Sequence, residues 1–146
     1  MTRYLLDTNI ISDAVKPAPS PRLAHWMQAQ KDSDLFIAAM SIAEIWRGIL
    51  LLPAGRRRSG LETWFVGSAG PPRLFAGRVL AFDEPAALAW ARIMIDGKAQ
   101  GFTLDVTDTI IAATAEANQC VVVTANEDDF RTVPCFNPMA GQLAQP

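Results

Sequence analysis

Four short apolar runs alternate with longer segments in which apolar residues recur every three or four positions. Each run has the length of a strand, and together they cover residues 3–6, 35–38, 78–82 and 120–124. The longer segments predict helices over residues 9–15, 21–30, 41–52, 55–68, 85–100 and 106–118. Strands that are apolar throughout are typical of a parallel sheet buried on both faces. The pattern therefore predicts a three-layer α/β/α sandwich around a short parallel sheet, followed by an irregular tail from about residue 134.

The amino-acid composition is typical of a folded protein and argues against general binding to nucleic acid. The 146 residues are 50% hydrophobic with a net charge of −2, which predicts one domain over residues 1–146 and gives no general affinity for nucleic acid. The longest apolar stretch, residues 35–52, carries Glu44 and Arg47 near its middle, so it predicts a strand and a buried helix rather than a membrane span. Asp7 interrupts the first apolar run too early for a signal peptide. We therefore expect a soluble, cytoplasmic protein with no membrane partner.

The first strand ends at a carboxylate. The segment RYLLDTNIIS places Asp7, Thr8 and Asn9 directly after four strand residues. In parallel α/β sheets ligands bind outside the carboxyl ends of the strands, so this position suits a functional acid. The alternative is helix capping, worth about 1 kcal/mol, for which all three residue types are suited. Because Thr8 or Asn9 would serve equally well as the cap, capping does not require Asp7.

The second acid, Glu44, has two structural alternatives. Ser41 and Glu44 have the spacing of a capping box, in which the glutamate bonds back to the amide of the N-cap. Apolar neighbours predict that this helix is largely buried, and a buried carboxylate needs a partner or a cation. Arg47, three residues further on, is the other candidate partner. The sequence leaves these alternatives open.

The remaining two acids stand where a helix begins and where the last strand ends. Asp108 falls in the first turn of a predicted helix, with Asp105 or Thr107 as the expected N-cap, and an acid there complements the helix dipole. Asp129 ends a run of three acids after the apolar run at residues 120–123. An acid in such a loop is often simply solvated, so each position alone is a weak indication of function.

The joint pattern is more specific than any single acid. Each of the four follows an apolar strand or opens an apolar helix, so all can meet at one edge of the sheet. Two carboxylates 5 Å apart repel by roughly 3 kcal/mol at an effective dielectric constant near 20. A cluster of four therefore predicts a bound hard divalent cation, Mg²⁺ or Mn²⁺, which also makes a bound water a better nucleophile.

Four segments carry a family resemblance that covers essentially the whole chain. LLDTNIIS, SIAEIWRGI, VTDTIIAATA and VVTANEDDF, in this order, resemble the motifs of PIN-domain proteins, most of all the VapC and FitB-like toxins of type II toxin–antitoxin modules. The resemblance implies a PIN fold and an Mg²⁺- or Mn²⁺-dependent ribonuclease that hydrolyses RNA phosphodiester bonds with a metal-activated water. It assigns the catalytic and metal-binding roles to Asp7, Glu44, Asp108 and Asp129, with Asp7 and Asp108 as the first choices for direct ligands.

The same resemblance implies supporting residues and partners. The polar residues expected to orient the acids are Thr8, Asn9, Thr124 and Asn126. Many relatives carry an arginine where this chain has Ala125, which removes one expected RNA contact. The implied partners are an RNA substrate, a cognate antitoxin that inhibits the enzyme, a second copy in a homodimer, and promoter DNA reached only through the antitoxin.

One basic patch and two other classes of function complete the expectations. Arg56, Arg57 and Arg58 form the only concentrated basic patch and are candidate RNA contacts, although a solvated helix face has the same composition. The alternative function is a non-catalytic PIN-fold binding module that acts through a toxin–antitoxin complex on promoter DNA or RNA. A receiver-like or phosphatase-like domain would need a lysine after a strand, and none of the three lysines follows a predicted strand end.

Overall fold

The chain folds around one five-stranded sheet, as described for residues 1–140 by a computed structural model. The central strand β1 (Arg3–Leu6) lies between β2 (Leu35–Ala38) and β4 (Cys120–Val123), and β3 (Val79–Leu80) and β5 (Cys135–Phe136) form the edges. Every neighbouring pair is parallel, and Leu5 aligns with Phe36 on β2 and Val122 on β4. The predicted parallel sheet is therefore confirmed.

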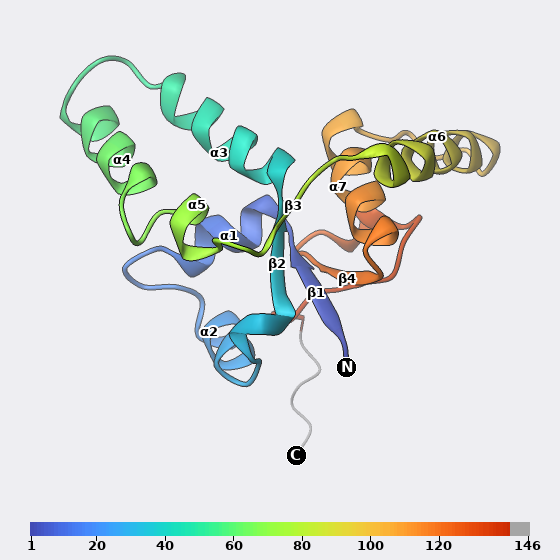
Figure 1. The fold of residues 1–146 in the computed structure, drawn as a ribbon, viewed down its shortest axis with the longest axis horizontal. Coiled ribbons are helices and arrows are strands. Elements are labelled where there is room, and N and C mark those ends of the chain that lie inside the picture. The colour runs from blue at the N-terminus through green and yellow to red at the C-terminus, as the bar shows by residue number, and fades with distance from the viewer. Residues whose placement is uncertain (141–146) are drawn as a thin grey trace.

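Helices cover both faces of this sheet, which explains why its strands are apolar throughout. α6 (Glu84–Ala99) and α7 (Val106–Ala117) lie on one side, and α1 (Thr8–Ala14), α2 (Pro21–Gln28) and α5 (Pro71–Leu74) lie on the other (Figure 1). Successive strand side chains point to opposite faces, so Leu5 packs in the core under α6 and α7 whereas Leu6 packs in the core under α1 and α2. This is the three-layer sandwich expected from the sequence.

A further helix pair extends beyond the carboxyl end of β2. α3 (Ala39–Leu50) follows that strand directly, and α4 (Arg56–Val66) packs back against it (Figure 1). The rings of Trp46 on α3 and Phe65 on α4 lie 4.8 Å apart between centroids, which fixes the pair near its outer contact. Beside α1, the two helices border a space next to the carboxyl edge of the sheet.

Some predicted boundaries were wrong. The tail expected to be irregular from residue 134 contains β5, whose Phe136 carbonyl accepts from the Thr124 amide at 3.0 Å. Two-residue strands such as β5 and β3 are too short to show a periodic sequence pattern. They are defined by their backbone hydrogen bonds to neighbouring strands. The prolines after Gly70 start the short helix α5, which the apolar pattern did not predict. Residues 141–146 of the predicted tail lie outside the described part of the chain.

The remaining helix boundaries agree with the predicted ones to within about two residues, a difference within the usual range between assignment methods. Within residues 1–140, no helix is long and apolar enough to cross a membrane.

Candidate functional site

The polar residues after β1 and β4 lie between the two central strands, where the order in which the chain adds strands to the sheet reverses. The chain builds the sheet outward from β1 to β2 and β3 on one side and to β4 and β5 on the other. The Asp7 amide donates to the Val123 carbonyl at 2.9 Å and so extends the pairing of β1 with β4 by one residue. Such a switch point, at the carboxyl ends of the strands, is the usual ligand site of an open α/β sheet.

Asp7 is the most tightly held acid of the site. It is only 5% exposed, and its carboxylate accepts from the Thr8 amide at 2.7 Å and from Thr124 Oγ1 at 3.0 Å. Burial raises the pKa of Asp7, the two hydrogen bonds oppose that shift, and the charges of Glu44 and Asp129 add to it. Asp7 is also the N-cap of α1, so the capping alternative holds for Asp7 itself, and neither Thr8 nor Asn9 takes that position.

Glu44 is held by a residue from a different element. Thr8 Oγ1 donates to Glu44 Oε1 at 2.5 Å and also lies 3.0 Å from the buried Ser41 Oγ. α3 begins at Ala39 with Ala38 as its N-cap, two residues earlier than predicted, so Ser41 and Glu44 do not form a capping box. Ser41 is instead a supporting residue that the sequence did not reveal, because its partner Thr8 is 33 residues away.

The second structural alternative for Glu44 also fails. Within residues 1–140, no ion pair joins Arg47 to Glu44, and Arg47 is exposed. The partner of the Glu44 carboxylate is therefore a hydroxyl, and its negative charge is not neutralised by the nearest arginine in the sequence.

Asp108 lies at the start of α7, where a second acid caps the helix. The Asp105 carboxylate accepts from the Asp108 amide at 3.0 Å, which confirms Asp105 as the N-cap. Burial and, after it, the charges of Asp105, Asp129, Asp7 and Glu44 raise the pKa of Asp108 to about 7. An acid with this pKa is about half protonated at neutral pH, unlike an ordinary surface aspartate.

Asp129 is held within its own loop, in the 3₁₀ helix Glu127–Phe130 that follows β4. Asn126 Nδ2 donates to Asp129 Oδ2 at 2.6 Å, while the Asn126 amide donates to Thr124 Oγ1 at 3.0 Å. Thr124 therefore connects the exposed Asp129 loop to the buried Asp7. The neighbouring Asp128 does not join the cluster in this way, because it forms an ion pair with Arg131 at 3.3 Å.

The four acids fit a divalent cation by chemistry but do not form a closed ligand set. They offer carboxylate oxygens beside threonine hydroxyls, the hard donors that Mg²⁺ and Mn²⁺ prefer, and none of them is ion-paired to a lysine or arginine within residues 1–140. In the same part of the chain, however, no three acidic, histidine or cysteine side chains lie close enough together to hold a metal ion as they stand. After burial, the charges of Glu44 and Asp129 contribute to the raised pKa of both Asp7 and Asp108, so the four acids interact electrostatically although they do not enclose an ion.

Not every predicted residue joins this cluster. The Asn9 side chain is exposed and, within residues 1–140, makes no hydrogen bond. The three arginines of α4 also separate: Arg58 contacts Glu62 at 3.5 Å, Arg56 is exposed, and Arg57 lines a cavity of about 690 Å³ that Thr8 and Glu44 border. Only Arg57 of the predicted patch therefore reaches the neighbourhood of the acids.

A parallel α/β sandwich with four acids at the carboxyl ends of its strands is typical of a metal-dependent nuclease domain. Comparison with known proteins identifies the family. The family model described as PIN domain matches residues 4–134, so the chain belongs to the PIN-domain family. It is 37% identical over 136 residues to the toxin FitB of Neisseria gonorrhoeae strain FA 1090, covering 92% of this chain and 96% of that protein.

Two further relatives agree with this assignment. The VapC ribonuclease Y4jK of Sinorhizobium fredii strain NGR234 is 36% identical over 126 residues, covering 86% of this chain and 89% of its own. The solved structure of FitAB bound to an IR36 DNA fragment contains a chain with a TM-score of 0.86 and 34% identity, covering 97% of this chain and 99% of that one. The expected membership of the PIN family, in its VapC and FitB-like branch, is confirmed.

Proposed function

We propose that this protein is an Mg²⁺- or Mn²⁺-dependent endoribonuclease and the toxin of a type II toxin–antitoxin module. The observation that supports this most strongly is that Asp7, Glu44, Asp108 and Asp129 meet at one edge of the sheet with no ion-paired lysine or arginine among residues 1–140. Burial and, after it, the charges of the other acids raise the pKa of Asp108 there to about 7. Such repulsion is unfavourable unless the site takes up positive charge, and RNA cleavage is an activity that uses a divalent cation at such a site. The relative named as a VapC ribonuclease supports RNA as the substrate.

In this proposal Asp7, Glu44, Asp108 and Asp129 hold the ion. When bound, the ion would neutralise their charges, lower the pKa of a water molecule and stabilise the charge that develops on the phosphate. Asp108 and Asp129 would turn toward Asp7, which Thr124 and the Thr8 amide already hold in place. The Thr8 hydroxyl orients Glu44 through its bond to Oε1, leaving Oε2 available.

Asp129 has a similar division between its two oxygens. Asn126 holds Oδ2, so Oδ1 remains available to accept a proton from the attacking water or to bind the ion. Asp108 would exchange its proton for the cation near neutral pH, because its raised pKa keeps the proton bound below about 7. Binding of the ion should therefore strengthen as the pH rises through this range.

The proposed partners follow from the family. A cognate antitoxin would bind the toxin and suppress cleavage, and the complex would reach promoter DNA through the antitoxin, as the solved FitAB complex is bound to DNA. We also propose that the protein acts as a homodimer in the cytoplasm. The antitoxin and promoter DNA are proposed from the relatives, and the homodimer and its location from the family resemblance.

The decisive experiment incubates the purified protein with cellular RNA and Mn²⁺ or Mg²⁺, beside an EDTA control. We expect cleavage by the parent, loss of cleavage in EDTA, and loss in Asp7→Ala. Asp32→Ala is the matched control, because Asp32 is an exposed acid just before β2, at the amino end of the sheet. Equal cleavage by Asp7→Ala and the parent would contradict the proposed site. Absence of cleavage by a folded parent with either metal would favour the non-catalytic binding module.

A further inference from the structure

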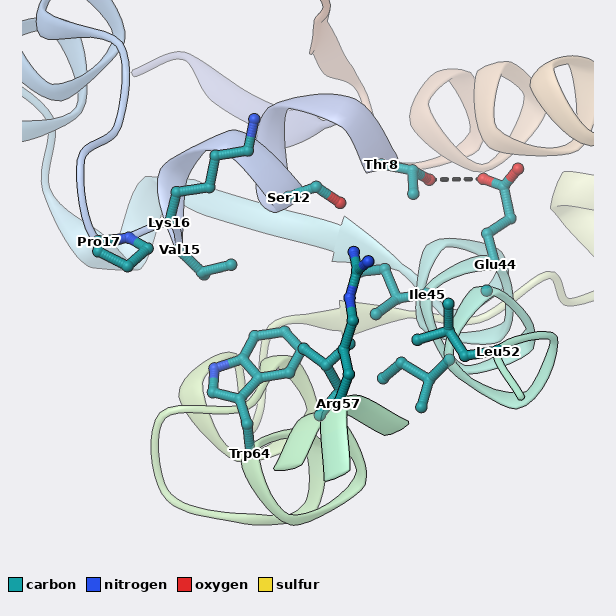
Figure 2. Close-up of a pocket in the computed structure, with 13 residues that line it drawn as sticks. Thr8, Ser12, Val15, Lys16, Pro17, Glu44, Ile45, Leu52, Arg57 and Trp64 are labelled. Atoms are coloured by element: carbon teal, nitrogen blue, oxygen red, sulfur yellow. Dashed lines mark hydrogen bonds between the residues drawn. The ribbon is translucent and has the colours of Figure 1, made fainter. Parts of the chain in front are cut away.

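The cavity beside the acids is lined by three helices and has two distinct ends. Thr8 and Glu44 lie at one end, Lys16 and Pro17 at the other, and Arg57 reaches from α4 into the space between them (Figure 2). Its volume of about 690 Å³ lies within the usual range for sites that enclose a small organic group. The cavity therefore continues directly from the edge of the sheet where the acids are held.

Its lining is apolar apart from the two cations and the groups at the acid end. Apolar surface comes from Ile45 on α3, from Leu52 just after α3, and from the half-buried indole of Trp64 on α4. Aromatic and aliphatic surface in a concave site favours a flat apolar group, and an indole stacks well on a nucleobase. The lining therefore suits the base of a nucleotide better than it suits a phosphate alone.

The two cations are available to a ligand. Lys16 and Arg57 are exposed, and within residues 1–140 neither side chain makes a salt bridge or a hydrogen bond. Arg58 differs, because it contacts Glu62 and the Leu52 carbonyl. Two cations without partners beside an apolar cavity attract a ligand that combines an anionic and an apolar part.

We propose that this cavity, here called the nucleotide pocket, holds an unpaired RNA nucleotide next to the phosphodiester that is cut. The base lies against Trp64, Ile45 and Leu52, and the flanking phosphates contact Arg57 and Lys16. The inference rests on the proposed ribonuclease function, because the shared border at Thr8 and Glu44 brings the neighbouring phosphate to the acids. A base in a duplex is stacked and paired and cannot enter such a pocket, so occupation of the pocket requires an unpaired nucleotide.

The test measures binding of a fluorescently labelled six-nucleotide RNA to the full-length protein in EDTA, where no metal-dependent cleavage occurs. We expect Trp64→Leu and Arg57→Ala each to weaken binding about tenfold, since loss of one stacked base or one phosphate contact has effects of this order. Arg56→Ala should weaken binding markedly less, because Arg56 does not line the pocket, and Arg73→Ala on α5 should leave binding unchanged. The same sequence in a duplex should bind more weakly than the single strand.

Salt dependence separates the two parts of the pocket. Arg57→Ala should reduce the slope of log affinity against log salt by about 0.7, because one phosphate contact to a single strand is lost, whereas Trp64→Leu should leave the slope unchanged. Trp64→Phe should restore most of the affinity lost in Trp64→Leu, and thermal unfolding of each variant reports whether it is folded. A photoreactive 4-thiouridine in the RNA should crosslink to residues 57–64.

Several outcomes would overturn the inference. Equal losses for Arg56→Ala and Arg57→Ala would indicate a diffuse basic surface, and unchanged affinity in folded Trp64→Leu would assign the cavity to a protein segment instead of RNA. The two proposals fail in different ways. If Asp7→Ala is inactive while Arg57→Ala and Trp64→Leu cleave RNA with the parent's KM, the pocket is wrong and the ribonuclease stands. If the parent cleaves nothing but shows the predicted binding pattern, the pocket stands and the ribonuclease is wrong.

Discussion

The four acids at the edge of the sheet are held in two different ways. Asp7 and Glu44 are bound by hydroxyls from elsewhere in the chain: Thr124 lies 117 residues from Asp7, and Thr8 lies 36 residues from Glu44. On the other side of the site, the Asp108 amide is bound by Asp105 and the Asp129 carboxylate by Asn126, in each case at a separation of three residues. One half of the site depends on the folded sheet, and the other half depends on local turns.

The contrast between long-range and local hydrogen bonds suggests how the fold accommodates acids that repel one another. The buried Asp7 has two hydrogen-bond donors that fix its position, so its orientation is established before a ligand arrives. Asp108 and Asp129 are more exposed: the Asp108 carboxylate makes no hydrogen bond within residues 1–140, and the Asp129 carboxylate is held only by the exposed bond from Asn126. The fixed half thus provides the frame toward which the local half can close.

The largest effect is expected from Asp108→Asn, which tests the local half. Removing one direct ligand should lower RNA cleavage by at least about a hundredfold, the upper end of the effect of losing an outer-shell partner. The same change should abolish the rise in melting temperature that Mn²⁺ gives the parent, measured by differential scanning fluorimetry. Asp32→Ala is the control and should keep the shift. A variant that gains as much stability from Mn²⁺ as the parent would show that Asp108 is not a ligand.

Thr124→Val tests the fixed half and should destabilise the protein by about 1–3 kcal/mol. Valine has nearly the same shape, but it leaves the buried Asp7 Oδ2 without its donor and the Asn126 amide without its acceptor. Urea unfolding in EDTA measures the change. Thr103→Val, at an exposed loop position, is the control and should change stability by less than about 0.5 kcal/mol. Equal effects at the two positions would mean that the hydroxyl does not hold Asp7.

The pH dependence of stability should distinguish Asp108 from an ordinary surface acid. Its folded pKa of about 7 lies above that of the unfolded chain, so the folded state binds the extra proton between about pH 4 and 7. The free energy of unfolding of the metal-free parent should therefore fall as the pH rises through this window. Asp108→Asn lacks this loss and should be more stable than the parent above pH 7, by about 1–2 kcal/mol after allowance for solvent screening.

Below about pH 4 Asp108 is protonated in both states, so the two proteins should differ little there. Urea titrations in EDTA at a series of pH values measure the difference. A constant difference between the parent and Asp108→Asn from pH 4 to 8 would contradict the assigned electrostatics.

The smallest change in stability is expected for Asn126→Ala. The bond from Nδ2 to the exposed Asp129 lies in solvent, so its loss should reduce the free energy of unfolding by no more than about 0.5 kcal/mol. Cleavage should nevertheless fall about tenfold, because the Asp129 carboxylate loses the group that orients it. Steady-state cleavage of a labelled RNA, beside urea unfolding, separates the two effects. A variant with parental cleavage would show that Asp129 is oriented by another group.

The parts of the site that the sequence predicted correctly are mainly those with local causes. Apolar strands ending in acids predicted the parallel sheet and the edge at which Asp7 lies, and Asp105 was recognised as a possible cap because its partner is three residues away. The Thr8–Glu44 bond was not predicted, and a capping box at Ser41 was considered instead. The local pattern of Ser41 and Glu44 was real, but the folded helix begins two residues earlier and places both side chains beside Thr8.

Apart from α5 and β5, sequence alone determined the succession of helices and strands along the chain, the apolar character of both sheet faces and the positions of four acids after strands or at helix starts. These features follow from short-range periodicity and from backbone preferences that act within a few residues. Only the tertiary structure decided that Thr124 binds Asp7, that Thr8 binds Glu44, and that Arg57, but not Arg56, reaches the cavity beside them. Those contacts join elements far apart in the chain, and they exist only when the parallel strands and the α3–α4 pair are packed together.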